Sequence, residues 1–231
     1  MSPTLTETPY QRPSHTVEDY LMNMHVLERD QGEIVAARLA EILHVTPATV
    51  ANTLARMERD DLITGRGHGK SIHLTETGRE AAHSVMRRHM LTEWLLLKIL
   101  KLPFQQIHAE AHNMEHAISP LLEEQLKVLL DNPSVCPHGN PFPGRENATK
   151  DWIPLIRFKE GDQVVIRRLH EIAENDEELL DYMIRHGILP GQKATIIENL
   201  AFNQTLSLQL ESGTCTLGYA TAANIYAEKH A

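Results

Sequence analysis

The chain has 231 residues, of which 42% are hydrophobic and 5% aromatic, and its formal net charge is −9. This length can bury a sizeable core in one or two domains. Its two cysteines exclude a disulfide scaffold and fit a reducing compartment. No apolar run approaches the roughly 20 residues of a membrane span, so we expect a soluble cytoplasmic protein with no membrane partner. An acidic chain is a poor first candidate for binding nucleic acid, and its 14 histidines call for an explanation.

The residue pattern divides the chain into four parts. Residues 1–14 lack the basic-then-apolar layout of a signal peptide and predict a disordered tail. Residues 15–76 predict a winged helix-turn-helix domain, and residues 77–150 a helical dimerisation segment that ends in a linker rich in proline and glycine. Residues 151–231 predict short strands around one helix, typical of an SH3-like β-barrel. The predicted fold class is therefore mainly α with a small β domain.

The first domain carries the signals of a helix-turn-helix and a hairpin. VEDYLMNMHVLERD, with Thr16 as its N-cap, predicts one helix, and IVAARLAEILHV predicts a second. Thr46 caps a third helix, with Pro47 at its first position, where a missing N–H costs nothing. Two short strands surround the glycine-rich segment GRGHGK. The third helix turns three apolar residues towards the core: Val50, Leu54 and Met57.

The opposite side of this third helix has the small and polar residues that a DNA-recognition helix needs. Asn52 can bond to adenine edges, and the small residues before it can contact thymine methyl groups. Arg56 and Arg59 are candidates for phosphate, while the glycines of the hairpin let the backbone approach DNA closely. A plain helical hairpin in a core is the alternative, but it leaves the wing unexplained. The predicted DNA-binding residues are Thr46, Pro47, Ala48, Thr49, Asn52, Arg56, Arg66 and Lys70.

The helical segment contains more leucine than three helices can cover by themselves. We therefore predict that part of this surface is a homodimer interface, the alternative being packing against the other segments. The leucines concerned are Leu91, Leu95, Leu96, Leu97, Leu100, Leu121, Leu122, Leu126, Leu129 and Leu130.

Imidazole and carboxylate groups recur at helical spacing in the same segment. When antiparallel helices face each other, residues four apart on each helix form the two halves of a metal site. A lone histidine on a helix would be structural, whereas this many on two adjacent helices favour metal binding. The residues are His89 and Glu93 on one predicted helix, and His108, His112, Glu115 and His116 on the next.

Oxygen and nitrogen donors favour Mn(II) and tolerate Fe(II), Co(II) and Zn(II). Asp19 on the first helix could add an oxygen and tie the DNA-binding domain to the metal, although periodicity alone makes it a solvated residue. Cys136 and His138 form a Cys-x-His pair in the linker, for which the alternative is a buried cysteine beside a turn.

Several segments resemble one known family in their order and spacing: TVEDYL, TVANTLARMERDDLI, LTETGREAA, VMRRHMLTEWLL, IHAEAHNMEHAIS and CPHGNPFPG. The chain is similar to the diphtheria toxin repressor and manganese transport regulator family of metal-dependent transcriptional repressors. Its final part, with HGILPG, resembles the FeoA-like SH3-like domain of three-domain members. The resemblance implies a homodimer that represses metal-uptake genes by binding a palindromic operator in double-stranded DNA.

The resemblance also implies two metal sites per subunit. The primary, regulatory site would use Asp19, His112, Glu115 and His116, with His89 as a candidate bridge. From the residue pattern alone, the acidic run HEIAENDEELLD is solvated, but the resemblance draws two of its glutamates into a second site. In some manganese-type members the Cys-Pro-His-Gly loop contributes there too. The residues of the second site are then His89, Glu93, His108, Glu171, Glu174, Cys136 and His138.

The chain departs from both subgroup patterns at the primary site. Asp19 is the residue of manganese-responsive members, which usually have glutamate where His112 stands, and iron-responsive members usually have cysteine there. Imidazole raises the affinity for later divalent metals, and Met22 replaces a further glutamate of some manganese members. The predicted order is Mn(II), then Fe(II), with Zn(II) or Co(II) binding in vitro.

A binuclear metalloenzyme and a metal-binding accessory protein are the two alternative classes of function. A binuclear metalloenzyme lacks a candidate general base apart from the ligands, and a metal-binding accessory protein leaves the helix-turn-helix without a role. We therefore predict that the protein is not an enzyme. Metal would instead fix the recognition helices in a DNA-binding arrangement, with a coupling free energy of about 1–3 kcal/mol per site.

Overall fold

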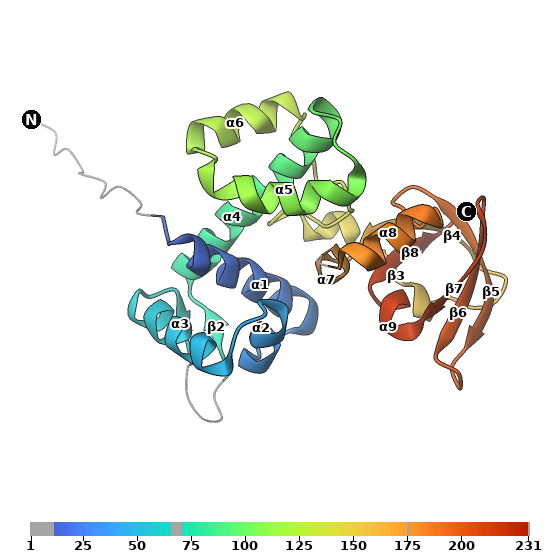
Figure 1. Ribbon diagram of the computed structural model, residues 1–231, viewed down its shortest axis with the longest axis horizontal. Helices are drawn as coiled ribbons and strands as arrows, with labels where there is room; N and C mark the ends of the chain where they lie inside the picture. The colour runs from blue at the N-terminus through green and yellow to red at the C-terminus, as the bar shows by residue number, and fades with distance from the viewer. Residues whose placement is uncertain (1–11, 66–70, 175, 231) are drawn as a thin grey trace, which may run out of the picture. The chain divides into compact units, whose positions relative to one another are not determined.

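The computed structural model describes residues 12–65, 71–174 and 176–230 (Figure 1). The chain divides into two compact units, Met1–Val85 and Met86–Ala231, and each is described by itself. Most of the predicted tail, and Arg66 and Lys70 of the predicted wing, lie outside the described residues. Within those residues, no helix combines the length and apolarity needed to cross a membrane.

Within the described residues, the first unit contains three complete helices, a short hairpin and the beginning of α4 (Glu76–Trp94), which continues into the second unit. Helix α1 begins two residues earlier than predicted, because the Ser14 carbonyl accepts hydrogen bonds from the N–H groups of Val17 and Glu18. The prediction of Thr16 as the N-cap is therefore wrong. The elements are α1 (His15–Gln31), α2 (Ala36–Ile42), α3 (Pro47–Arg59), β1 (Ile63–Thr64) and β2 (His73–Leu74).

The helix-turn-helix and the base of the hairpin are confirmed. The Thr46 hydroxyl accepts a hydrogen bond from the Thr49 N–H at 3.2 Å, and Pro47 occupies the first turn. Strands β1 and β2 pair antiparallel. Gly65 has a φ of +87°, and a Cβ atom there would lie 2.0 Å from the Ser71 carbonyl oxygen, so position 65 requires glycine.

Helix α2 is shorter than the apolar pattern predicts. The pattern starts at Ile34, but this residue forms a β-bridge with Ile72 and so joins the hairpin instead of the helix. Both isoleucines are buried in the core that the helices and hairpin share. The three predicted core residues of α3, Val50, Leu54 and Met57, are also buried there.

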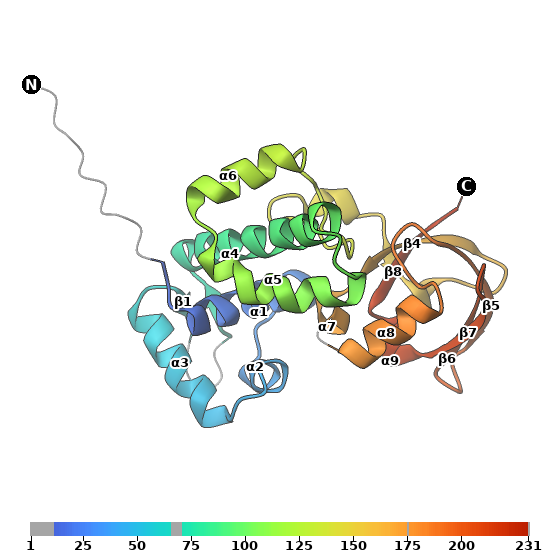
Figure 2. The same ribbon diagram turned by 45° about the horizontal axis from the view of Figure 1, so that its top comes forward.

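Three further helices follow: α4 (Glu76–Trp94), α5 (Ile107–Met114) and α6 (Pro120–Leu129) (Figure 2). The predicted single helix FQQIHAEAHNMEHAI is wrong in detail, because 3₁₀ turns at Phe104–Gln106 and Glu115–Ala117 flank α5. Ser119 caps α6 as predicted, since its hydroxyl accepts a hydrogen bond from the Leu122 N–H at 3.2 Å.

The remaining chain forms a six-stranded antiparallel sheet in the order β3-β8-β4-β5-β6-β7, curled around a core (Figure 2). The predicted fold class is confirmed. One predicted strand, TCTLGYATAANIYA, is instead two strands separated by a helical turn. The elements are β3 (Ile153–Pro154), β4 (Gln163–Leu169), α7 (Glu171–Glu174), α8 (Glu177–Arg185), β5 (Lys193–Leu200), β6 (Thr205–Leu210), β7 (Gly213–Gly218), α9 (Tyr219–Ala222) and β8 (Ile225–Lys229).

Candidate metal centre and DNA-binding face

Four predicted ligands meet in the second unit, from α4, α5 and α7. His89 Nε2 lies 3.2 Å from Glu93 Oε1 and 3.2 Å from His108 Nδ1. His108 Nδ1 lies 2.9 Å from Glu174 Oε2. One ligand atom from each residue falls within 4.8 Å of all the others, which is the spacing of donors that can surround one ion.

The Cys-Pro-His-Gly loop approaches the same carboxylate. Cys136, His138 and Glu93 each offer a ligand atom within 4.8 Å of the other two, and all three residues are buried. His138 Nδ1 lies 3.2 Å from Glu93 Oε1. Among the residues that the structure describes, His138 Nε2 and Glu93 Oε2 are buried without a hydrogen-bond partner. Buried polar atoms of this kind need an explanation, and a metal ion would supply one.

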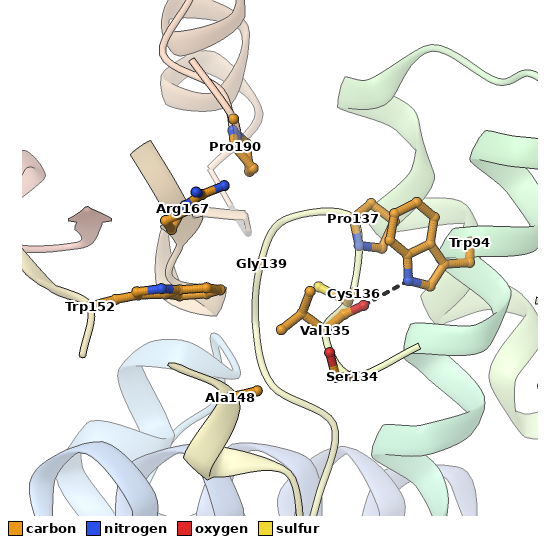
Figure 3. A pocket seen from close by; sticks show the side chains of 11 residues that line it. Trp94, Ser134, Val135, Cys136, Pro137, Gly139, Ala148, Trp152, Arg167 and Pro190 are labelled. Atoms are coloured by element: carbon orange, nitrogen blue, oxygen red, sulfur yellow. Dashed lines mark hydrogen bonds between the residues drawn. The ribbon is translucent and has the colours of Figure 1, made fainter. Parts of the chain in front are cut away.

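The backbone of this loop is fixed from both sides. Trp94 Nε1 donates a hydrogen bond to the Val135 carbonyl at 2.8 Å (Figure 3). The Leu169 N–H donates to the His138 carbonyl at 2.8 Å. Gly139 has a φ of +91°, and a Cβ atom there would lie 2.0 Å from the Arg167 carbonyl oxygen. The loop can therefore lie against β4 only with glycine at this position.

A buried polar network that the sequence analysis missed positions Glu174. The Asn140 amide donates to Glu174 Oε1 and to the Leu169 carbonyl, and its oxygen accepts from Arg168 Nε at 2.5 Å. Arg168 also bonds to Glu171 at 3.1 Å. Glu171, a predicted ligand, therefore lies beside Arg168 and is not among the residues gathered around Glu93. Asn140 lies within the matched motif CPHGNPFPG, and this was the signal that could have identified it.

The predicted primary-site residues of the second unit form another group. Glu115 Oε1 lies 3.3 Å from His112 Nδ1 and 3.4 Å from His116 Nε2. Its other oxygen accepts a hydrogen bond from His89 Nδ1 at 2.6 Å, so His89 contacts both groups. Arg88, which no sequence signal identified, is buried and donates to the Glu115 carbonyl at 3.0 Å.

Asp19 belongs to the first unit, where it lies on α1. Its backbone carbonyl accepts a hydrogen bond from the Asn23 amide at 2.9 Å. Its role as a metal ligand stays a prediction.

The buried groups hold each other in their charged forms. Burial alone would lower the pKa of His89, but the charge of Glu93 and the hydrogen bond to Glu115 outweigh it and raise this pKa to about 9. Burial opposes ionisation of Glu115, yet hydrogen bonds from His112 and His89 lower its pKa to about 2. Burial and nearby carboxylates raise the pKa of the Cys136 thiol. A metal ion must displace protons from such ligands, so its apparent affinity should rise with pH.

The metal-free protein should consequently lose stability at both ends of the pH range. His89, whose pKa rises from 6.5 to about 9, should contribute about 3 kcal/mol to the free energy of unfolding below pH 6.5 and lose it as pH rises towards 9. The contribution of Glu115, whose pKa falls from 4.5 to about 2, should disappear as pH falls through that interval. Urea unfolding at a series of pH values, with metal removed by chelation, measures both the alkaline and the acid loss of stability.

His89→Gln is the matched variant for the alkaline loss of stability, because glutamine keeps a polar side chain but cannot titrate. Its unfolding free energy should vary less between pH 6.5 and 9 than that of the unmodified protein. An identical dependence in the two proteins would contradict the assignment to His89.

On the recognition helix, the predicted base-reading residues are accessible. Thr46, Pro47, Ala48, Thr49 and Asn52 are exposed, while Arg56 is half-buried and its guanidinium lies 3.5 Å from the Ser14 hydroxyl. Arg59 is exposed at the end of the same helix. The side chains available for DNA therefore extend over the whole outer side of α3.

Several large apolar side chains on α6 and on the segment after α4 are exposed. Leu91, Leu96, Leu126 and Leu130 are buried, so part of the leucine-rich surface is used inside the subunit. The exposed set, here called the α6 face, consists of Ile99, Leu100, Leu121, Leu122, Val128 and Leu129. An apolar set of this kind is typical of an interface.

Three family descriptions match successive parts of the chain. Residues 14–68 match the iron dependent repressor N-terminal DNA binding domain, and residues 75–144 match the iron dependent repressor metal binding and dimerisation domain. Residues 153–229 match the FeoA domain. These matches define the class of protein, a metal-dependent transcriptional repressor with separate DNA-binding and dimerisation domains.

Curated proteins and solved structures agree with this class. The iron-dependent repressor IdeR of Mycobacterium tuberculosis (strain H37Rv) is 36% identical over 192 residues, covering 78% of this chain and 83% of that protein. The diphtheria toxin repressor of Corynebacterium jeikeium (strain K411) is 40% identical over 220 residues, covering 86% and 90%. A manganese-dependent transcriptional repressor in complex with manganese has a TM-score of 0.81 at 27% identity, covering 93% and 100% of the two chains. ScaR with bound Zn²⁺ has a TM-score of 0.78 at 27% identity, covering 94% and 100%.

The chain belongs to the iron-dependent repressor family, which includes the diphtheria toxin repressors. The predicted resemblance, the DNA-binding function and the homodimer are confirmed at this level. Because its relatives are transcriptional repressors, the prediction that the protein is not an enzyme is also confirmed.

Proposed function

We propose that this protein represses metal-uptake genes and that divalent metal activates its binding to a palindromic operator. Mn(II) is the first candidate, Fe(II) the second, and Zn(II) or Co(II) are expected to bind in vitro. The observation that carries the proposal is the buried gathering of imidazole, carboxylate and thiol groups, in which Glu93 Oε2 and His138 Nε2 have no hydrogen-bond partner within the described residues.

Two sites per subunit are proposed. His112, Glu115 and His116, which contact one another in the second unit, would hold the primary ion together with Asp19. The second site would use His89, Glu93, His108 and Glu174, with Cys136 and His138 beside them. Glu171 was also predicted as a ligand of this second site. To bind the ion there, it would have to give up its hydrogen bond from Arg168.

The donor chemistry supports a borderline divalent metal. Carboxylate oxygens suit Mn(II), and imidazole suits Fe(II), Zn(II) and Co(II) as well. The names of the relatives include three of these metals, since one relative is called iron-dependent, one solved repressor is in complex with manganese and another has bound Zn²⁺. A bound ion would supply concentrated positive charge, and the protein would supply the ligand atoms, most of them on buried side chains.

Metal would act by tying the first helix to the dimerisation segment. With Asp19 and the Glu115 group on one ion, α1 and therefore α3 would be held at the spacing of two operator half-sites. A metal can favour the state in which α3 is held in place over a state in which it is mobile only by binding the first state more tightly. The metal charge would also offset part of the net charge of −9, which otherwise opposes approach to DNA.

The deciding experiment is a titration of operator binding with Mn(II), Fe(II) and Zn(II), read together with the number of ions bound per subunit. We expect binding to require metal and to saturate with site occupancy. Equal operator affinity with and without each metal would contradict the proposal. Because DNA affinity depends on salt, all titrations must share one ionic strength.

Asn52→Ala should weaken operator binding by about 1–3 kcal/mol and relax the preference at one base position. Asn52 is exposed on α3 and carries the amide that can pair with an adenine edge. Binding to a panel of single-base operator variants measures the change.

Arg59→Gln is the matched comparison on the same helix. If Arg59 contacts a phosphate, its loss should weaken binding to all DNA sequences alike. The slope of log operator affinity against log salt concentration should fall by about 1. A uniform loss for Asn52→Ala, with unchanged base preference, would assign Asn52 to backbone positioning instead.

A further inference from the structure

Glu93 belongs to two sets of ligand atoms. One set comprises His89, Glu93, His108 and Glu174, and the other comprises Glu93, Cys136 and His138. We propose that the buried group holds two metal ions that share the Glu93 carboxylate, so that each subunit binds three ions when the primary site is counted. This inference rests on the proposed function only in taking these donors to bind metal.

The number of donors argues for two ions. Protein sites for one ion of this kind usually take three or four protein ligands, and open positions are filled by water. Six residues meet here, and their separation into sets of four and three, with one in common, gives each ion an ordinary complement. A single ion with four of these ligands would leave the remaining donors unused, and Glu93 Oε2 and His138 Nε2 are already buried without a hydrogen-bond partner among the described residues.

The two oxygens of Glu93 differ in their surroundings. Oε1 lies 3.2 Å from His89 Nε2, 3.3 Å from His108 Nδ1 and 3.2 Å from His138 Nδ1, so it faces both sets. Oε2 is buried and, among the described residues, has no hydrogen-bond partner. His138 Nε2 is in the same condition, on a side chain that is 0% exposed. The spare oxygen and the spare nitrogen are donors that the first ion does not use.

A carboxylate can bridge two ions that lie about 3.5–4 Å apart. Glu174 can act as a second bridge, because its Oε2 lies 2.9 Å from His108 Nδ1 and 3.5 Å from His138 Nδ1. Asn140 holds the other oxygen of Glu174 and so fixes the orientation of this carboxylate.

The two positions differ in chemical softness. The first offers two imidazoles and two carboxylates, which suit Mn(II) or Fe(II). The second offers a thiol, an imidazole and a carboxylate, which suit Zn(II), Fe(II) or Co(II). Cys136 also lines a pocket together with Trp94, Trp152 and Arg167 (Figure 3).

The test uses the full chain, freed of metal by chelation and reloaded with Mn(II) or Co(II). We expect three ions per subunit by elemental analysis after gel filtration. The Mn(II) form should show the paramagnetic resonance of an exchange-coupled pair in addition to one isolated ion. The Co(II) form should show a thiolate-to-metal charge-transfer absorption.

The two cysteines provide matched variants. Cys136→Ser should bind one ion fewer and lose both the charge-transfer absorption and the coupled signal. Cys215→Ser removes the other buried thiol, which lies in the barrel 3.2 Å from the Tyr182 hydroxyl, and should change none of these measurements.

Two ions per subunit, with only isolated Mn(II) signals, would overturn the shared-carboxylate proposal. If operator binding still required metal in that case, the proposed function would stand without it. Failure of the protein to retain any metal would overturn both.

Discussion

Replacing Asp19 by alanine should remove the metal dependence of operator binding while leaving the fold and metal binding at the proposed second site unchanged. Asp19 lies on α1 of the first unit, whereas the other proposed ligands of the primary ion lie in the second. Asp19 is thus the proposed ligand that lies in the same unit as the DNA-binding helices. Coupling of about 1–3 kcal/mol per site corresponds to about 5- to 150-fold in operator affinity. Fluorescence anisotropy of a labelled operator, with and without Mn(II), measures this ratio.

Glu33→Ala is the control for this variant. Glu33 is exposed just after α1, and its replacement by alanine removes the same negative charge as Asp19→Ala. It should respond to Mn(II) like the unmodified protein. If Asp19→Ala also responds fully, Asp19 returns to the reading that its periodicity gives, a solvated residue. The metal would then have to act on DNA binding through the second unit alone.

Placing a charge on the α6 face should convert the dimer into a monomer and weaken operator binding about a hundredfold or more. Val128 is 74% exposed and Leu121 is also 74% exposed, so either can be changed to aspartate without a cost to the core. A monomer engages one half-site at a time and loses the gain in effective concentration that links two binding events. Sedimentation analysis and operator titration on the same samples test both statements.

Phe202→Asp is the control, because Phe202 is 87% exposed in the barrel and lies outside the α6 face. It should leave the protein dimeric. A dimer that survives both Val128→Asp and Leu121→Asp would show that subunits associate through another surface. In that case the exposed leucines would need a different partner.

Local signals predicted the elements whose ends are fixed by local chemistry. The caps at Thr46 and Ser119, each followed by proline, begin α3 and α6 as expected. Where tertiary pairing competes with a helical pattern, the prediction fails. Ile34 has helical spacing with the residues of α2, but its bridge to Ile72 satisfies its backbone in a sheet instead.

In the candidate site, too, local spacing predicted some of the contacts and tertiary structure determined the others. Helical spacing predicted that His89 and Glu93 act together, because four residues is one turn of α4. It also placed His108, His112 and His116 on one helix face, but α5 ends at Met114, so His116 comes from the following 3₁₀ turn. His108 then joins Glu174, whereas His112 and His116 join Glu115. No local pattern could show that Glu174, in an acidic run, is buried by the fold around Asn140.

The barrel forms one wall of the candidate metal centre. Glu174 comes from the segment after β4, and the Leu169 N–H of β4 holds the His138 carbonyl. Both belong to the same compact unit as α5 and the ligands of α4, Met86–Ala231. Without the FeoA domain, the proposed second site would lose Glu174 and the hydrogen bond that holds the His138 carbonyl. Removal of this domain is therefore expected to change metal binding as well as to remove a barrel.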